Sequence, residues 1–265
     1  MPRVITIASG KGGVGKTTVT ANLGIALTRL GYHVCLVDAD VAMANLSLLL
    51  GMHSSPITLH DVLLGEASVQ DALYEGPEGV KFIPSGLSLE NYRRVDTERL
   101  GSVVQSIAPM FDYVLLDAPA GIEKNVLSSL AAAEEVLLVT QPTSASIADV
   151  LKIKITTQRL GAKPIGVVLN FVLREKGEVS EDEVSKMLEL PVLGIIPFDD
   201  EVRRSFMQEK VSPVVVRKPN APASLAFAKA ALRVAGKPVE SVAQEKAGLI
   251  QSLLNSFRSL FGKPR

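Results

Sequence analysis

Cysteine is nearly absent: Cys35 is the single one among 265 residues. One thiol excludes an intramolecular disulfide, and it excludes the paired cysteines that carry a metal ion or an iron–sulfur cluster. The three histidines, His33, His53 and His60, lack the short spacing typical of zinc ligands. The sequence therefore argues against metal carriers and cluster-dependent reductases, and it fits a reducing, cytoplasmic compartment.

Long apolar runs and an excess of charge are also missing. No stretch approaches the ~18 apolar residues that a helix needs to cross a bilayer, and the chain opens without a charged-then-apolar signal segment. We therefore expect a cytoplasmic protein whose contact with the inner face of the cell membrane is peripheral. Basic and acidic residues number 28 each, so no net charge draws the chain to nucleic acid, and no specific nucleic-acid partner is expected.

Short apolar runs alternate with helix-length segments along the chain, and 47% of the residues are hydrophobic. This alternation predicts an α/β fold with a doubly wound, mainly parallel sheet and helices on both faces, formed as one domain by residues 1–236. Several runs end in a small or polar residue at the edge where such sheets bind ligands. The expected strands are Val4–Ala8, His33–Asp38, Val80–Pro84, Tyr113–Asp117, Val136–Thr140, Ile165–Asn170 and Val192–Ile196.

A glycine-rich turn follows the first expected strand and leads into an expected helix, Thr18–Leu30. The turn reads Gly10-Lys11-Gly12-Gly13-Val14-Gly15-Lys16-Thr17, the form G-x-x-x-x-G-K-T. Its backbone N–H groups are expected to surround a phosphate, to which the start of the helix adds partial positive charge. Lys16 would then reach the β- and γ-phosphates, Thr17 would bind Mg²⁺ and Thr18 would contact the α-phosphate. The predicted fold is thus that of a P-loop NTPase.

Lys11 adds a second lysine to this turn. The run from Lys11 to Thr18 resembles the deviant Walker A motif of the MinD/ParA family, and within it the archaeal and bacterial MinD branch. The resemblance implies an ATPase that forms a homodimer with ATP, in which Lys11 crosses to the partner's nucleotide. A cation supplied in this way acts like an arginine finger, which contributes ~10³–10⁵ in rate. The alternative is a solvated loop lysine.

Two further strand ends carry carboxylates. Asp38-Ala39-Asp40 closes the second expected strand, and Asp117 closes Tyr113–Asp117. Carboxylates there can hold Mg²⁺ through water or orient an attacking water, although many only cap helices. We predict Thr17, Asp38 and Asp117 as the Mg²⁺ site, and the resemblance makes Asp40 catalytic beside Lys11 and Lys16.

The same resemblance extends to two switch segments. Asn45-Leu46 matches the first switch, and Asp117-Ala118-Pro119-Ala120-Gly121-Ile122 matches the second. Asp117, Pro119 and Gly121 are its expected functional residues, because Gly121 can bring a backbone N–H near the γ-phosphate. Loss of that phosphate would release the loop. An ordinary turn at a strand end is the alternative.

The base is predicted to be adenine, which makes ATP the expected cofactor with Mg²⁺. A guanine site of the usual kind needs Asn-Lys-x-Asp, whereas Phe171 follows Asn170. The resemblance implies that Asn170, Pro197 and Asp199 frame the adenine. Phe171 and Thr143 depart from the family pattern, as does Val211.

The C-terminal part changes character. Residues 237–246 are rich in linker-forming residue types, and residues 247–262 predict an amphipathic helix with no acidic residue. Such a helix suits an anionic membrane surface, and it resembles the membrane-targeting helix of the MinD branch. Docking onto its own domain or another helix is the alternative. Its apolar face consists of Leu249, Ile250, Leu253, Leu254, Phe257, Leu260 and Phe261.

The leading hypothesis is an ATP-dependent, dimerising, membrane-associated ATPase that acts as a spatial regulator of division-site placement or of a polar structure. The resemblance also implies a protein activator, with Ile147–Arg159 as a family-level partner face. One alternative is a DNA-partitioning ATPase of ParA type, and another is a flagellar-number regulator of MinD type. The basic residues that could serve DNA are Arg203, Arg204, Lys210, Arg217 and Lys218.

Overall fold

The structure, a computed structural model, describes residues 1–52, 55–86, 94–207 and 211–239. One eight-stranded sheet runs through it in the order β3-β4-β2-β5-β1-β6-β7-β8. Every neighbouring pair is parallel except β3 and β4. The strands are β1 (Arg3–Ala8), β2 (Val34–Asp38), β3 (Tyr74–Glu75), β4 (Lys81–Ile83), β5 (Tyr113–Asp117), β6 (Glu135–Thr140), β7 (Lys163–Val172) and β8 (Val192–Pro197).

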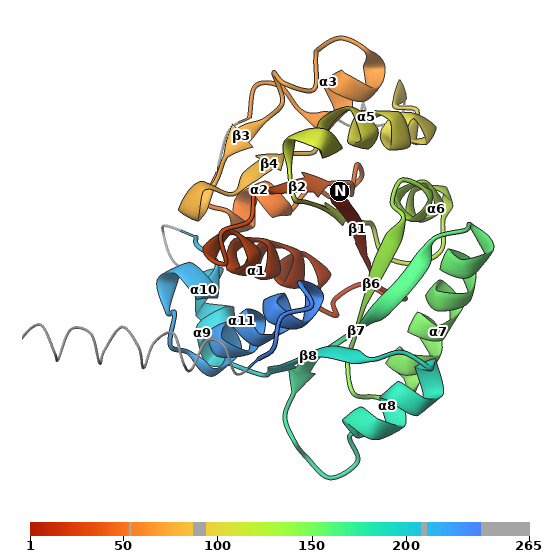
Figure 1. Cartoon of the computed structure of the whole chain (residues 1–265), viewed down its shortest axis with the longest axis vertical. Coiled ribbons are helices and arrows are strands. Elements are labelled where there is room, and N and C mark those ends of the chain that lie inside the picture. Colours follow the sequence, from red (N-terminus) through yellow and green to blue (C-terminus); the bar gives the residue numbers. More distant parts are fainter. Residues whose placement is uncertain (53–54, 87–93, 208–210, 240–265) are drawn as a thin grey trace, which may run out of the picture.

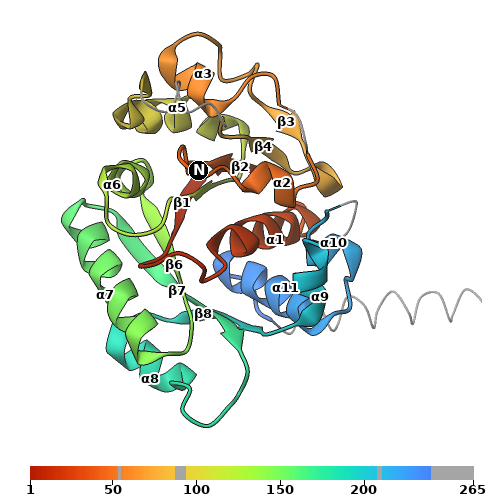
Figure 2. The same ribbon diagram turned by 180° about the vertical axis from the view of Figure 1, so that it is seen from behind.

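Helices cover both faces of this sheet (Figures 1 and 2). One face packs against α1, α10 and α11; the other is covered by α3 and α5 over one half and by α6, α7 and α8 over the other. No helix among the described residues has the length and apolarity of a membrane span. The helices are α1 (Lys16–Arg29), α2 (Leu46–Leu49), α3 (Leu59–Leu64), α5 (Leu100–Ile107), α6 (Lys124–Ala131), α7 (Ser144–Arg159), α8 (Glu181–Leu188), α9 (Asp200–Ser205), α10 (Val214–Arg217) and α11 (Pro222–Val234), with 3₁₀ turns at Pro77–Gly79, Thr97–Arg99 and Ala108–Met110.

The predicted doubly wound fold is confirmed. Its strands could be predicted because parallel strands that are buried on both faces consist of continuous hydrophobic residues. Every residue of β2 and β5 is buried. The predicted start of the first helix at Thr18 is wrong: α1 begins at Lys16, directly after Gly15, which has a left-handed φ of 86°. The antiparallel strand β3 was not predicted, since its two residues are too few to show a periodic pattern. The predicted linker and amphipathic helix lie almost wholly outside the described residues.

The chain reverses its winding direction at β1, and this determines where ligands can bind. β1 pairs with β5 on one side and with β6 on the other, so the elements that follow β1 lie to one side of it and those after β5 lie to the other. The carboxyl ends of the strands around such a point form a crevice in open α/β sheets. The glycine-rich turn after β1 lies at this point.

Candidate phosphate-binding site

The glycine-rich turn has a single backbone path that distant residues support. Gly13 and Gly15 have φ values of 78° and 86°, which only glycine adopts at little cost. The side-chain amide of Asn170, at the end of β7, donates to the carbonyl oxygen of Val14 at 2.8 Å. A Cβ atom added to Gly15 would lie 2.2 Å from that amide nitrogen. The turn is therefore held from behind by β7, and it lines a cavity of about 610 Å³.

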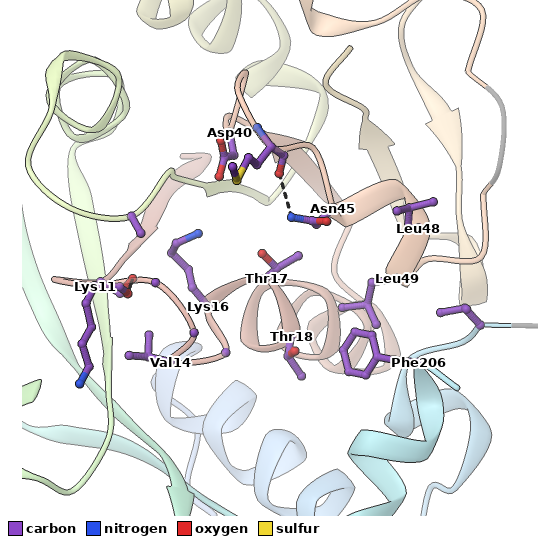
Figure 3. A pocket seen from close by; sticks show the side chains of 17 residues that line it. Lys11, Val14, Lys16, Thr17, Thr18, Asp40, Asn45, Leu48, Leu49 and Phe206 are labelled. Carbon is purple, nitrogen blue, oxygen red and sulfur yellow. Dashed lines mark hydrogen bonds between the residues drawn. The ribbon is translucent and has the colours of Figure 1, made fainter. Parts of the chain in front are cut away.

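The two lysines of the turn point in different directions (Figure 3). Lys16 is buried, and its ammonium group lies 3.3 Å from a carboxylate oxygen of Asp117. The hydroxyl of Thr20 donates to the same oxygen at 3.0 Å. Lys11, in contrast, extends away from the centre of the cavity. Both lysines line the cavity, but their side chains point in different directions from the turn.

Asp38 and Asp117 end neighbouring strands and are register partners in the β2–β5 ladder. Both are buried. Burial raises the pKa of Asp38 above its ordinary value, and the negative charge of Asp117 raises it further. Two carboxylates in such a position need a nearby cation to remain ionised together. The ammonium group of Lys16 is one such cation, and the hydroxyl of Thr17 lies on the same cavity wall.

The segment that follows Asp38 is organised around its carboxylate. The backbone N–H groups of Asp40, Asn45 and Leu46 donate to its two oxygens at 3.1–3.2 Å. Asp40 lines the cavity, and it also accepts from the N–H groups of Ala42 and Met43. The predicted first switch is thus wrapped around Asp38, while Asp40 both faces the cavity and caps its own turn.

His60 also supports this segment, and sequence reasoning passed over it as a poor metal ligand. Its ring is fully buried, and Nε2 donates to the carbonyl oxygen of Val41 at 3.0 Å. Nδ1 has no hydrogen-bond partner among the described residues. Burial lowers the pKa of His60, which keeps the ring neutral. This contact could not be predicted from the sequence, because no local motif surrounds His60. It depends on the tertiary structure, which packs α3 against the segment of the first switch.

The predicted second switch leaves β5 beside the glycine-rich turn. Gly121 has a φ of 94°, and its N–H donates to the carbonyl oxygen of Ser9 at 3.4 Å, while the hydroxyl of Ser9 donates to the carbonyl oxygen of Lys11. Pro119 is half-buried, and Ile122 is 59% exposed. A short chain of backbone contacts therefore links this switch to the loop that carries Lys11.

The predicted adenine residues lie together, but their side chains are already engaged. Both oxygens of Asp199 accept backbone N–H groups, from Glu201 in α9 and from Ala223 in α11. The amide nitrogen of Asn170 is bonded to Val14, as described above. Beside them is a cavity of about 230 Å³ walled by Phe171, Phe198 and Phe206, which were not predicted as site residues. Asn170, Pro197 and Asp199 line the same cavity, so the predicted residues and these aromatic side chains surround one space that suits a planar base.

Comparison with known proteins agrees with this geometry. The sequence model of the CobQ/CobB/MinD/ParA nucleotide binding domain matches residues 5–213. The chain belongs to the MinD/ParA family of P-loop ATPases. The predicted family is thereby confirmed, and its deviant Walker A turn is the one held by Asn170.

Individual members of the family cover nearly the whole chain. An uncharacterised ATP-binding protein of Methanocaldococcus jannaschii is 41% identical over 264 residues, which are 99% of this chain and 98% of that protein. The septum site-determining protein MinD of Pyrococcus horikoshii, complexed with Mg-ADP, is 37% identical with a TM-score of 0.85, over 88% of this chain and 96% of its own. MinD of Aquifex aeolicus, in a complex with MinC, is 31% identical with a TM-score of 0.79, over 89% of this chain and 97% of its own.

The residues in and next to the cavity wall fit a Mg²⁺-nucleotide of the kind that this family binds: Thr17 lines the cavity, and the buried Asp38 and Asp117 are bonded to Asp40 and Lys16, which line it. Thr17, Asp38 and Asp117 offer only oxygen atoms, which are the ligands that Mg²⁺ prefers. The backbone N–H groups of the turn and the start of α1 offer donors and partial positive charge, which suit phosphate. Because the pKa of Asp38 is raised, a divalent cation bound there would also favour the ionised form of this carboxyl group.

Replacing Gly15 tests the support of the turn. Gly15→Ala combines a left-handed φ, which costs a non-glycine residue about 1–2 kcal/mol, with a clash against the Asn170 amide. We expect its affinity for fluorescent ADP in Mg²⁺ to fall by about tenfold or more. Gly101→Ala, in α5 and away from the cavity, is the control, because Gly101 has no positive φ and the atom nearest to its added Cβ lies 3.9 Å away. Equal affinities in the two variants would contradict the proposed strain.

Replacing His60 tests the pH dependence of the switch support. The folded protein binds a proton at His60 less readily than the unfolded chain, so its stability falls as the pH falls through the unfolded pKa, near 6.5. His60→Gln keeps a donor for Val41 and does not titrate. We expect urea unfolding between pH 7 and pH 5 to show a smaller loss of stability in this variant than in the wild type. Replacement of the exposed His33 by Gln controls for loss of an imidazole, and equal slopes for wild type and His60→Gln would refute the assignment.

Proposed function

We propose that the chain is a Mg²⁺-dependent ATPase of MinD type that dimerises with ATP, binds the membrane as a dimer and regulates the position of a cellular structure. The single observation that carries the proposal is the opposite direction of Lys11 and Lys16 within one turn (Figure 3). Because Lys16 points into the cavity while the side chain of Lys11, which also lines it, points away from its centre, a second copy of the chain is the natural acceptor of Lys11.

The chain binds an adenine nucleotide together with Mg²⁺. The nucleotide supplies the phosphoanhydride bond, and Mg²⁺ would neutralise the charge of its phosphates. Lys16 and the N–H groups of the turn hold the phosphates, and Thr17 holds the metal with Asp38 and Asp117. Asp40 orients the attacking water from the cavity wall. The three aromatic walls of the smaller cavity exclude water around the base. Lys11 of the second copy neutralises charge that develops on the γ-phosphate.

Exposed apolar side chains near the larger cavity support dimerisation. Met43, Leu48 and Phe206 line that cavity and are 73%, 46% and 48% exposed. Ile122, in the second switch, is also exposed. Apolar side chains that gather on one face commonly mark an interface. A dimer across this face would bury them and bring each Lys11 toward the neighbouring nucleotide.

The C-terminal sequence couples this dimer to a membrane. Residues 247–262 predict a helix with one apolar face and no acidic residue, and each cation near an anionic surface contributes about 1 kcal/mol. One such helix binds weakly, whereas two on a dimer gain ~10²–10⁴ in avidity. Membrane residence would therefore follow the nucleotide. The protein would be cytoplasmic and peripheral on the inner face of the cell membrane.

The DNA-partitioning alternative has less support, because most of its basic residues are neutralised. Arg203 pairs with Asp200, and both Arg204 and Arg217 pair with Glu201. Lys210 lies outside the described residues. A flagellar-number regulator of MinD type would use the same chemistry with another cargo. The MinC complex of the A. aeolicus relative supports a protein partner, for which α7 is the proposed face.

Lys11 provides the sharpest test of dimer-dependent turnover. We expect Lys11→Ala to keep its affinity for ADP but to lose ATP-induced dimers and to hydrolyse ATP roughly 10²-fold more slowly, since a charge supplied in trans contributes ~10³–10⁵. Light scattering and phosphate release measure the two effects. Lys16→Ala should lose nucleotide binding itself, and Lys186→Ala, at an exposed position in α8, should behave as wild type. A Lys11→Ala protein that dimerises and turns over normally would refute the role in trans.

Sedimentation with anionic liposomes in ATP, in ADP and without nucleotide tests the membrane switch. We expect the full chain to pellet mainly in ATP, and a chain ending at Gly236 not to pellet. Leu254→Gln with Phe257→Gln should abolish pelleting, because the apolar face of the helix is lost. Ser252→Gln with Ser256→Gln, on the polar face, should preserve it. Pelleting that ignores the nucleotide or the tail would exclude the coupling.

A further inference from the structure

A groove runs between α11 and the edge strand β8, with a volume of about 480 Å³. One wall is a stripe of α11 at three- and four-residue spacing that includes Leu225, Lys229 and Arg233. The other wall is β8, from Gly194 to Pro197. The helix and the strand approach closely at two small residues, since a Cβ atom on Gly194 would lie 3.0 Å from that of Ala230. The groove shares no lining residue with the 610 Å³ nucleotide cavity.

The strand that borders the groove ends the sheet. β8 pairs with β7 alone, and in the described part of the chain no strand lies on its other side. Figure 1 shows β8 at this outer position, next to α11. Arg233 partly occupies the edge by donating to the carbonyl oxygen of Val192 at 3.3 Å. An open edge beside a groove is the geometry into which an extended peptide adds as a further strand.

The charge of the groove has one sign. Arg174, Lys229 and Arg233 line it, and no acidic side chain does. Glu175, Glu178 and Glu181 line a neighbouring cavity, which shares Val172, Arg174 and Ile195 with the groove, so Lys229 and Arg233 are the two cations that line the groove alone. Between the three cations the walls are apolar and include Ile195 and Leu225. An occupant that matches these walls alternates apolar side chains with carboxylates.

We propose that this groove is a docking site for an extended acidic segment of another protein, which adds to β8 as a strand and sets its carboxylates against Arg174, Lys229 and Arg233. Main-chain hydrogen bonds would provide affinity, and the cations would select the acidic sequence. Residues 246–265 of the chain itself are a poor occupant, because they contain no acidic residue and carry Arg258, Lys263 and Arg265. A bilayer surface fits less well than a peptide, since the apolar walls are recessed between a helix and a strand.

The test uses the ¹⁵N-labelled full chain and two synthetic probes: an acetylated, amidated peptide that alternates valine with glutamate, and its counterpart with lysine in place of glutamate. We expect the acidic probe to shift the amide signals of β8 and α11 and the lysine probe to leave them unchanged. Lys229→Glu with Arg233→Glu should weaken binding of the acidic probe by about tenfold. Arg159→Glu with Lys186→Glu changes the net charge equally at exposed positions of α7 and α8, and it should not weaken binding.

Three results would overturn the proposal: no shifts at millimolar probe, shifts that lie outside β8 and α11, or equal binding of both probes. A liposome arm separates a peptide site from a headgroup site. If Lys229→Glu with Arg233→Glu abolishes pelleting with anionic liposomes while the acidic probe still binds normally, the groove contacts lipid and the peptide assignment is wrong. Failure of the ATPase proposal would leave the shifts unaffected, because the probes bind away from the nucleotide cavity.

Discussion

The carboxyl groups of Asp38 and Asp117 are buried side by side at the ends of β2 and β5, and most of the nucleotide cavity is arranged around them. Two buried like charges repel each other, and each loses its hydration. The surrounding groups offset this cost: three backbone N–H groups bind Asp38, while Lys16 and Thr20 bind Asp117. The first switch owes its path to those N–H donors. Mg²⁺ strengthens an arrangement that the protein already favours.

This arrangement explains how changes at the phosphates can reach the surface. Asp38 is bonded to Asn45 and Leu46, and Leu46 opens the short helix α2, whose Leu48 is exposed beside the cavity. On the other side, Gly121 is bonded to Ser9, which in turn is bonded to Lys11. Both paths run through loop segments, which open at a lower free-energy cost than the core strands and helices do. A dimer interface built on them would respond to the nucleotide.

Strand β8 lines two different cavities. Ile196 lines the aromatic cavity, Gly194 and Ile195 line the groove beside α11, and Pro197 lines both. Asp199 connects the two regions, because it accepts N–H groups from the first turns of both α9 and α11. A partner on the edge strand would therefore contact the same helix that supports the base cavity. The groove shares no lining residue with the cavity that contains the phosphate-binding turn.

The sequence by itself determined the phosphate chemistry and the fold class, because both depend on local spacing. A turn with the spacing of Gly13, Gly15, Lys16 and Thr17, between a strand and a helix, is typical of a phosphate-binding loop. Buried parallel strands can be recognised in a sequence as short apolar runs. Tertiary structure alone decided which distant residues meet. Asn170 holds a turn 156 positions earlier, His60 supports the first switch, and α11 lies beside β8 to form a basic groove. Strand order creates these contacts, and hydrophobic periodicity carries no information about strand order.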